Sequence, residues 1–259
     1  MQRRRFIGSG LAGLAGIAVN TTGGRRLLVA PNGAPNRNDG RLSARPGTFR
    51  QNSGKVVPGT GPLGMGADRD GVLVVPESYT SAAPAPLILA LHGAGGAGER
   101  LARNLGSLAK DTGAILAAPD SRGGTWDAIR GEYDRDVVYI DALLVRLFRE
   151  YNIDERRITI AGFSDGASYA LSLGLINGDL FRRIAAFSPG FIVRGVRHGK
   201  PEVFVSHGRA DPILPFRQSN EQIVPSLRRD GYAVMFRDFD GGHAVPPEVL
   251  ATAVDWLRA

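Results

Sequence analysis

The chain has 259 residues, of which 43% are hydrophobic and none is cysteine. This length is sufficient for one sizeable domain with a full apolar core, and the lack of cysteine excludes disulfides, thiolate metal sites and a cysteine nucleophile. The formal charge is +7, but residues 1–55 carry nine Arg and one Lys against a single acid, a net of +9. The rest of the chain then holds 22 basic and 24 acidic side chains, a net of −2. Because a nucleic-acid-binding protein places its positive charge on the folded domain, we expect no nucleic-acid partner.

The first 30 residues have the pattern of an export signal. Three arginines, at positions 3–5, precede a short and glycine-rich apolar run from 6 to 19. That run is too short for a transmembrane helix, which needs about 20 apolar residues. The Arg-Arg-Arg-Phe-Ile stretch is similar to the twin-arginine pattern, so we expect 1–30 to be a twin-arginine-type signal of a bacterial protein. The mature protein would then be periplasmic or extracellular without a stable membrane anchor; a disordered basic tail is the alternative interpretation.

Residues 31–67 are rich in Gly, Pro, Asn and Arg and have little periodicity, which predicts a linker or a loosely held arm. From 68 to 259 the chain alternates short apolar runs with amphipathic segments. The predicted strands lie at 72–75, 86–91, 114–118, 157–161, 184–187, 203–205 and 234–239. The predicted helices lie at 101–110, 137–151, 166–175, 222–229 and 247–257. This alternation predicts an α/β domain with a mostly parallel central sheet, helices on both faces, and sites at the carboxyl ends of the strands.

Ser164 stands where the fourth predicted strand gives way to a helix, in the stretch AGFSDGAS. A serine on such a tight turn presents its hydroxyl above the sheet edge, and the flanking Gly162 and Gly166 permit the close return of the chain. The Gly-x-Ser-x-Gly pattern alone is weakly specific, and a helix start with Ser164 or Asp165 as the N-cap is the alternative. The strand–turn–helix context favours a nucleophile.

A serine nucleophile needs a base, and the chain has four histidines. His243 follows the last predicted strand, at the carboxyl edge where it can approach Ser164, so we expect it to be the base. His207, at the end of the sixth strand, is expected to pack or cap that strand end. His198 lies in a charged loop and is expected to be solvated, and His92 is expected to brace the loop that it begins.

The base in turn needs an acid that orients the imidazole and stabilises its charged form. Asp211 follows the sixth predicted strand, and the chain order Ser164, Asp211, His243 is the one found in α/β-hydrolases. Asp238 and Asp240 are the rival acids because they are close to His243 in the sequence. We expect Asp211 to be the acid and Asp240 to be a solvated turn residue.

The oxyanion of a tetrahedral intermediate needs backbone N–H donors. We expect one from Asp165, directly after the nucleophile, and one from Gly93 or Ala94 in the loop LHGAGGAGE, with Ala94 preferred. A phosphate-binding loop is the rival interpretation, but no Gly-Lys-Ser/Thr follows the glycines and the spacing does not fit a dinucleotide fingerprint. Trp126, after the third predicted strand, is expected either to flank the substrate or to be a partly buried packing residue.

Four motifs together resemble a known family: LILALHGAGG, AGFSDGAS, SHGRADPILPF and GGHAVPPEVLATAVDWL. They look like the small serine esterases of the α/β-hydrolase superfamily, of the phospholipase/carboxylesterase type or the polyhydroxybutyrate depolymerase type. The resemblance runs from about position 70 to the C-terminus. It implies an α/β-hydrolase fold and hydrolysis of a small-molecule or polymeric carboxylic ester through an acyl-enzyme, with no metal and no cofactor. The short stretch 189–200 departs from lipases that carry a large cap, and it implies an open site.

Other functions are compatible with the same residues. A peptidase, a thioesterase or an acyltransferase would use the same Ser164, Asp211 and His243. A catalytically silent binding protein of the same fold is a further alternative, although such proteins typically lack a member of the triad, and all three are present here. The sequence leaves the natural ester and the oligomeric state open.

Overall fold

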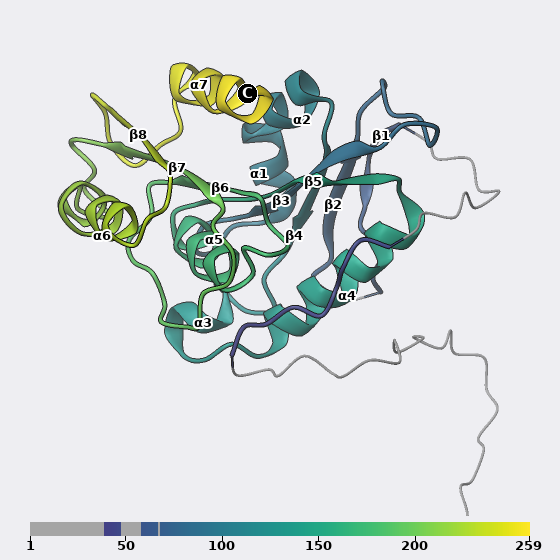
Figure 1. The fold of residues 1–259 in the computed structure, drawn as a ribbon, viewed down its shortest axis with the longest axis horizontal. Coiled ribbons are helices and arrows are strands. Elements are labelled where there is room, and N and C mark those ends of the chain that lie inside the picture. The colour runs from purple at the N-terminus through teal and green to yellow at the C-terminus, as the bar shows by residue number, and fades with distance from the viewer. Residues whose placement is uncertain (1–38, 48–57, 67) are drawn as a thin grey trace, which may run out of the picture. The chain divides into compact units, whose positions relative to one another are not determined.

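The computed structural model describes residues 39–47, 58–66 and 68–259. The expected export signal, 1–30, lies outside these residues. The described part forms one mixed α/β unit built around a twisted sheet (Figure 1). No helix within it is long and apolar enough to cross a membrane.

The sheet has eight strands among the described residues, in the order β1-β2-β4-β3-β5-β6-β7-β8. Pairings from β4 through β3, β5, β6 and β7 to β8 are parallel, and only β1–β2 and β2–β4 are antiparallel. The mostly parallel sheet expected from the sequence is therefore confirmed. The strands are β1 Gly59–Pro62, β2 Gly71–Val75, β3 Ala85–Leu91, β4 Ile115–Pro119, β5 Ile153–Phe163, β6 Arg183–Phe187, β7 Glu202–Gly208 and β8 Val234–Phe239.

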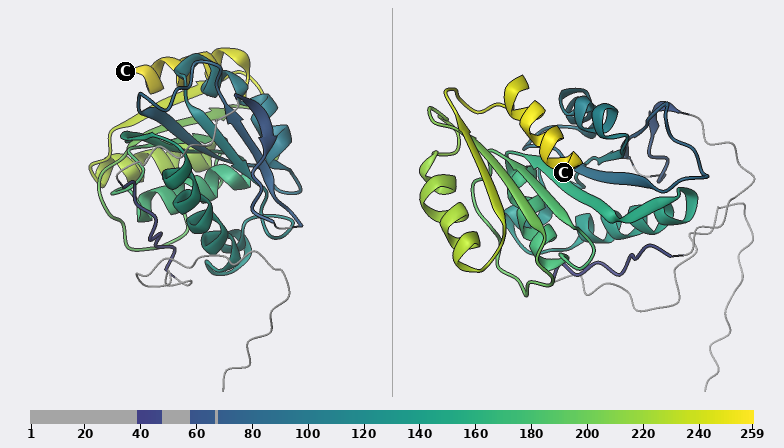
Figure 2. Two further views of the ribbon diagram at one scale, coloured as in Figure 1. Left: turned by 90° about the vertical axis from the view of Figure 1, so that its right-hand side faces the viewer. Right: turned by 45° about the horizontal axis from the view of Figure 1, so that its top comes forward.

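Helices cover both faces of the sheet (Figure 2). They are α1 Gly98–Asn104, α2 Gly106–Thr112, α3 Asp127–Arg130, α4 Arg135–Glu150, α5 Asp165–Ile176, the π-helical η1 Gln218–Ile223, α6 Val224–Arg229 and α7 Pro247–Arg258. Buried residues of α4, α5 and α6 share one core, and buried residues of α1, α2 and α7 share the other. Strand β3 contributes to both, because Leu87, Leu89 and Leu91 face the first core while Ile88 and Ala90 face the second.

The predicted elements differ from the observed ones at a few places. The single helix expected at 101–110 is two short helices, α1 and α2, which meet at the buried Leu105. Strand β1 and the four-residue α3 were not predicted, because GTGP has no apolar residue and α3 spans only about one turn. Residues 188–201, between β6 and β7, contain no helix, so no large cap is inserted there.

Part of the expected linker, 31–67, lies on the domain. Strand β1 pairs with β2, and the side chain of Leu63 is buried. Leu42 and Ala44 are also buried, in the segment coloured purple beside α4 in Figure 1. The described stretches of 31–67 are therefore integrated into the sheet and the core.

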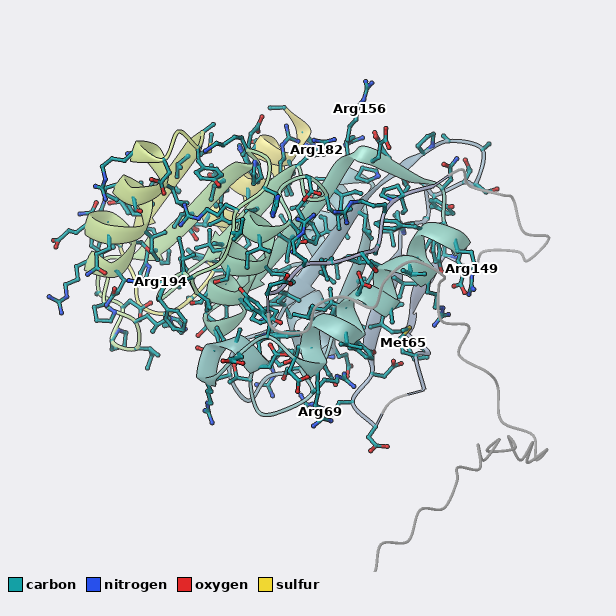
Figure 3. All side chains as sticks on the ribbon, turned by 60° about the horizontal axis from the view of Figure 1, so that its bottom comes forward. Met65, Arg69, Arg149, Arg156, Arg182 and Arg194 are labelled. Carbon is teal, nitrogen blue, oxygen red and sulfur yellow. The ribbon has the colours of Figure 1, made fainter. Side chains whose placement is uncertain are left out.

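Exposed arginines are dispersed over the domain. Arg149, Arg156 and Arg194 are exposed and project from well-separated parts of the surface (Figure 3). These three side chains therefore do not form a single basic face.

Candidate active site

Ser164 occupies a sharp turn between β5 and α5. Its backbone has φ 59° and ψ −124°, and its N–H donates to the carbonyl oxygen of Phe187 at 3.0 Å. A Cβ at Gly162 would lie 2.1 Å from the carbonyl oxygen of Gly166, and a Cβ at Gly166 would lie 2.0 Å from that of Leu91. Both glycines are required by the closeness of the backbone, as the sequence predicted. The turn holds the serine above the carboxyl ends of the parallel strands, where a substrate can approach.

Asp211 and His243 come together after β7 and β8. His243 Nδ1 lies 2.7 Å from Asp211 Oδ2, and Asp211 Oδ1 accepts the N–H groups of Ile213 and Leu214 at 2.8 and 2.9 Å. Burial opposes ionisation of Asp211, but the hydrogen bonds from His243 and from the two backbone amides outweigh it and lower the pKa of this carboxyl. An ionised Asp211 fixes the His243 tautomer with its proton on Nδ1, which leaves Nε2 as the basic nitrogen.

The imidazole of His243 lies beside the serine turn. Its ring centroid is 4.7 Å from that of Phe163, the residue preceding Ser164. His243 Nε2 is buried and has no hydrogen-bond partner among the described residues, so it does not bond to Ser164 in this structure. In the absence of substrate such contacts are commonly long, and they tighten in the Michaelis complex.

The rival acids pair elsewhere. Asp238 and Asp240 both form ion pairs with Arg209, and neither is hydrogen-bonded or ion-paired to His243. The contact geometry therefore favours Asp211 over both.

The loop after β3 has two free amides next to Ser164. Gly95 N–H donates to Gly124 and Gly96 N–H donates to Gly93, whereas the amides of Gly93 and Ala94 donate no hydrogen bond within the described part of the chain. A Cβ on Gly93 would lie 3.6 Å from Ser164 Oγ, so this loop passes directly over the hydroxyl. The amide of Asp165, at the first position of α5, is likewise without an acceptor among the described residues. These three amides are the available donors for an oxyanion.

Comparisons with known proteins agree with this architecture. Residues 134–259 match the phospholipase/carboxylesterase family. The chain is 34% identical over 158 residues to the probable feruloyl esterase C of Aspergillus oryzae, covering 58% of this chain and 57% of that one. It is 29% identical over 212 residues to the feruloyl esterase C of Emericella nidulans, covering 69% and 77%. The crystal structure of esterase PE8 superposes with a TM-score of 0.59 at 27% identity, covering 73% of this chain and 97% of that one.

The chain has the α/β-hydrolase fold. The resemblance read from its four motifs is thereby confirmed. The chain spans little more than half the length of the first curated relatives that it matches.

His92 braces the loop above Ser164. Its Nε2 accepts the N–H of Ser121 at 3.0 Å, so Nδ1 carries the proton and donates to the carbonyl oxygen of Gly93 at 2.7 Å. That oxygen belongs to the same peptide unit as the N–H of Ala94, so the bond also fixes the direction of this amide. Burial lowers the pKa of His92, which keeps the ring neutral in this role.

The expectation that Trp126 touches substrate is not supported. Its side chain has no exposed surface, its Nε1–H donates to the carbonyl oxygen of His92 at 2.8 Å, and its ring stacks on Tyr169 at a centroid distance of 5.3 Å. The aromatic ring lies beneath the loop after β3 and supports it, which agrees with the alternative of a packing residue. The neighbouring Thr125 contacts the residue that follows Ser164, since its hydroxyl donates to Asp165 Oδ2 at 2.7 Å.

His207 is buried at the end of β7, but it does more than cap the strand. Its Nε2 lies 3.3 Å from Asp211 Oδ2, a contact that the sequence analysis did not anticipate. The signal in the sequence was the four-residue spacing of His207 and Asp211 in SHGRAD, because the chain turns back sharply after β7 and brings the two side chains together. No cluster of three or more His, Asp or Glu side chains in the described part of the protein has the arrangement of a metal site.

Proposed function

We propose that this protein is an exported serine hydrolase that cleaves carboxylic esters through an acyl-enzyme on Ser164. The observation that carries the proposal is the hydrogen bond between His243 Nδ1 and Asp211 Oδ2, which leaves a free imidazole nitrogen beside the Ser164 turn. A hydroxyl on a strained turn, an oriented base and unpaired amides are the parts that acyl transfer to serine requires.

In the first half of the reaction Ser164 Oγ attacks the ester carbonyl carbon while His243 Nε2 takes the hydroxyl proton. The negative charge on the substrate oxygen is stabilised by the amides of Asp165 and of Ala94 or Gly93, each worth roughly 3 kcal/mol in such sites. His243 then gives its proton to the departing alcohol as the ester C–O bond breaks. The acyl group remains on Ser164.

In the second half a water molecule gives a proton to His243 Nε2 and attacks the acyl carbon. The C–Oγ bond breaks, His243 returns the proton to Ser164, and the carboxylic acid departs. Asp211 remains ionised throughout and stabilises the imidazolium in both halves.

The names of the relatives suggest which esters to test first. Several of them are called feruloyl esterase C or probable feruloyl esterase C, and another is called a bifunctional acetylxylan esterase/xylanase. No cap is inserted between β6 and β7, which is compatible with a bulky alcohol portion such as a sugar. We therefore propose aryl-acyl or acetyl esters of carbohydrates as the substrate class.

The test is hydrolysis of a panel by the purified chain lacking the first 30 residues. The panel contains methyl ferulate, an acetylated and a feruloylated oligosaccharide, aryl esters of graded chain length and a polyhydroxyalkanoate. We expect turnover of the carbohydrate esters, with Ser164→Ala inactive and equally stable to heat. Full activity in Ser164→Ala would contradict the nucleophile assignment, and turnover of the polyhydroxyalkanoate but of neither carbohydrate ester would contradict the substrate class.

We further propose that the export signal acts by the twin-arginine route. Replacement of both Arg3 and Arg4 by Lys should retain the protein in the cytoplasm of a bacterial host. Unchanged export of that variant, measured by cell fractionation, would contradict the route but not the hydrolase proposal.

A further inference from the structure

A second imidazole reaches the carboxylate of Asp211. The side chain of His207 has no exposed surface and both of its ring nitrogens have partners. Nδ1 lies 2.7 Å from Ser219 Oγ, at the start of η1, and Nε2 lies 2.8 Å from the carbonyl oxygen of Leu214. The same Nε2 lies 3.3 Å from Asp211 Oδ2. This buried ring therefore joins the acid loop to the following helix.

The partners determine the tautomer of His207. A carbonyl oxygen only accepts hydrogen bonds, so the proton must be on Nε2, which donates to Leu214 and also lies close to Asp211 Oδ2. Nδ1 is then an acceptor, and the Ser219 hydroxyl donates a hydrogen bond to it. Burial lowers the pKa of His207, in keeping with a neutral ring.

This arrangement leaves no free acceptor position on Asp211. Oδ1 accepts two backbone amides, and Oδ2 faces both His243 Nδ1 and His207 Nε2. The Asp211 side chain is fully buried, so solvent does not supply an alternative donor. The two imidazoles therefore share one carboxylate oxygen.

We propose that His207 is a positioning residue of the hydrolytic site: its Nε2–H shares Oδ2 of Asp211 with His243 and limits how strongly the carboxylate holds the His243 imidazolium. The inference rests on the proposed function, in which Asp211 and His243 are the acid and the base.

His207 destabilises the charged form of His243 through the shared carboxylate. A carboxylate oxygen that already accepts one hydrogen bond is a weaker acceptor for a second. The His207 Nε2–H also places positive charge 3.3 Å from Oδ2, the oxygen that would stabilise a charged His243. Both effects disfavour the imidazolium, so His207 favours the neutral form of His243, in which Nε2 is a free base.

The groups that face His207 are few. Asp211 and His243 are the charged or titratable ones that act on it, and the others are neutral: the Ser219 hydroxyl, the Leu214 carbonyl and the edge of the Phe216 ring. A change at His207 should therefore be felt through Asp211.

The test compares four variants with the wild type. His207→Phe removes the N–H and keeps a ring, whereas His207→Gln keeps an N–H close to the position of Nε2. Ser219→Ala keeps the imidazole but removes the donor to Nδ1, which weakens the Nε2–H as a donor. His198→Gln is the control, because this histidine lies outside the site. Thermal unfolding of each variant reports folding.

The first readout is the acidic limb of the kcat/KM profile against pH, on whichever ester the wild type hydrolyses. We expect this limb to move up by roughly 0.5–1 pH unit in His207→Phe. Ser219→Ala should shift it less in the same direction, and His207→Gln and His198→Gln should leave it in place. A purely structural role would lower thermal stability without moving the limb.

The second readout does not need turnover. The Nδ1 proton of His243, held by Asp211, should give a downfield proton NMR resonance that disappears in Asp211→Asn. It should move further downfield in His207→Phe and less so in Ser219→Ala, because the carboxylate becomes a better acceptor. If His207→Phe does not fold, Ser219→Ala decides the question with the same two readouts.

The outcomes separate the two proposals. An unchanged acidic limb and an unchanged resonance in folded His207→Phe, or in Ser219→Ala if that variant is the one that folds, would overturn the role of His207. A wild type that hydrolyses nothing would overturn the proposed function, while the resonance would still test the sharing of Asp211.

Discussion

Ser164 shows how a single residue links backbone strain to chemistry. Its positive φ costs on the order of 1–3 kcal/mol for a residue other than glycine, and such strain persists only where the surrounding structure imposes it. Here the Phe187 carbonyl holds the Ser164 amide, and the two flanking glycines allow the chain to reverse. A serine that caps a helix N-terminus needs neither a positive φ nor flanking glycines. The Ser164 side chain also makes no capping hydrogen bond to α5.

Asp136 is a second residue whose environment has a measurable consequence. It is buried in the first turn of α4, and its two oxygens accept the amides of Arg122 and Asp127 at 2.6 and 2.7 Å. Burial outweighs these hydrogen bonds and raises its pKa from 3.8 to about 6. The folded state therefore binds this proton more tightly than the unfolded state does, and the stabilisation is complete below about pH 4 and is lost as the pH rises through about 6.

We therefore expect Asp136→Asn to flatten the pH dependence of stability. In the wild type this group should contribute a fall of roughly 2–3 kcal/mol in the free energy of unfolding between pH 4 and pH 7. The measurement is urea unfolding across that range. The slopes of the free energy of unfolding against pH are compared, and not its absolute values, because the side-chain amide of the variant has one acceptor oxygen fewer than the carboxylate. Equal slopes in the two proteins would show that Asp136 titrates normally.

Single residues were predicted from the sequence where local pattern decided them. Ser164 and its glycines could be identified because a strand–turn–helix is a local feature. Trp126 was assigned in part to the substrate because its position in the chain placed it near the cleft, yet burial beneath the loop is decided by tertiary packing. The contact between His207 and Asp211 depends on the path of a loop, which no periodicity encodes.

At the scale of elements, the β5–α5 turn depends on backbone-to-backbone contact. Gly166→Ala should destabilise the protein by roughly 2–4 kcal/mol, because its Cβ would lie 2.0 Å from the carbonyl oxygen of Leu91 and neither backbone can yield freely. Gly106→Ala is the matched control, since a Cβ there meets nothing within 4 Å at the start of α2. Denaturant unfolding should show a large loss for the first and little change for the second. Equal stability of the two variants would mean that the turn is looser than described.

The helices and strands that could be predicted from the sequence were those with a regular pattern of apolar residues. The strands of the parallel sheet have apolar runs and were found, with boundaries that extend by a few residues in β5 and β7. Helix α4 was found because its apolar face repeats over four turns. Strand β1 was missed because an exposed edge strand needs no apolar alternation.

At the scale of the whole molecule, the segment 39–47 is joined to the domain by buried polar contacts. Asp141 on α4 accepts the amides of Ser43 and Ala44 at 2.7 and 2.8 Å and the hydroxyl of Ser43 at 2.6 Å. Asn177, after α5, accepts the amide of Leu42. Gly, Pro and Arg content predicted a loose arm here, because composition does not reveal which backbone amides a distant carboxylate will bind.

Asp141→Ala should detach this segment. Two backbone donors would lose their acceptor, at a cost of roughly 2–4 kcal/mol, and amide hydrogen exchange at Ser43 and Ala44 should accelerate strongly. Arg103→Ala, which breaks a solvent-exposed pair with Glu99 on α1, is the control and should change stability by less than about 1 kcal/mol. Slow exchange at both amides in Asp141→Ala would show that apolar contacts of Leu42 and Ala44 hold the segment without the carboxylate.

We propose that Ser164 is a nucleophile activated by His243 and Asp211. The most direct test is intact-protein mass spectrometry after reaction with a fluorophosphonate probe, followed by peptide mapping. We predict one adduct, on Ser164, that is absent in Ser164→Ala and forms much more slowly in His243→Ala and Asp211→Asn. A wild-type protein that stays unlabelled, or that is labelled at another residue with undiminished rate in all three variants, would contradict the account.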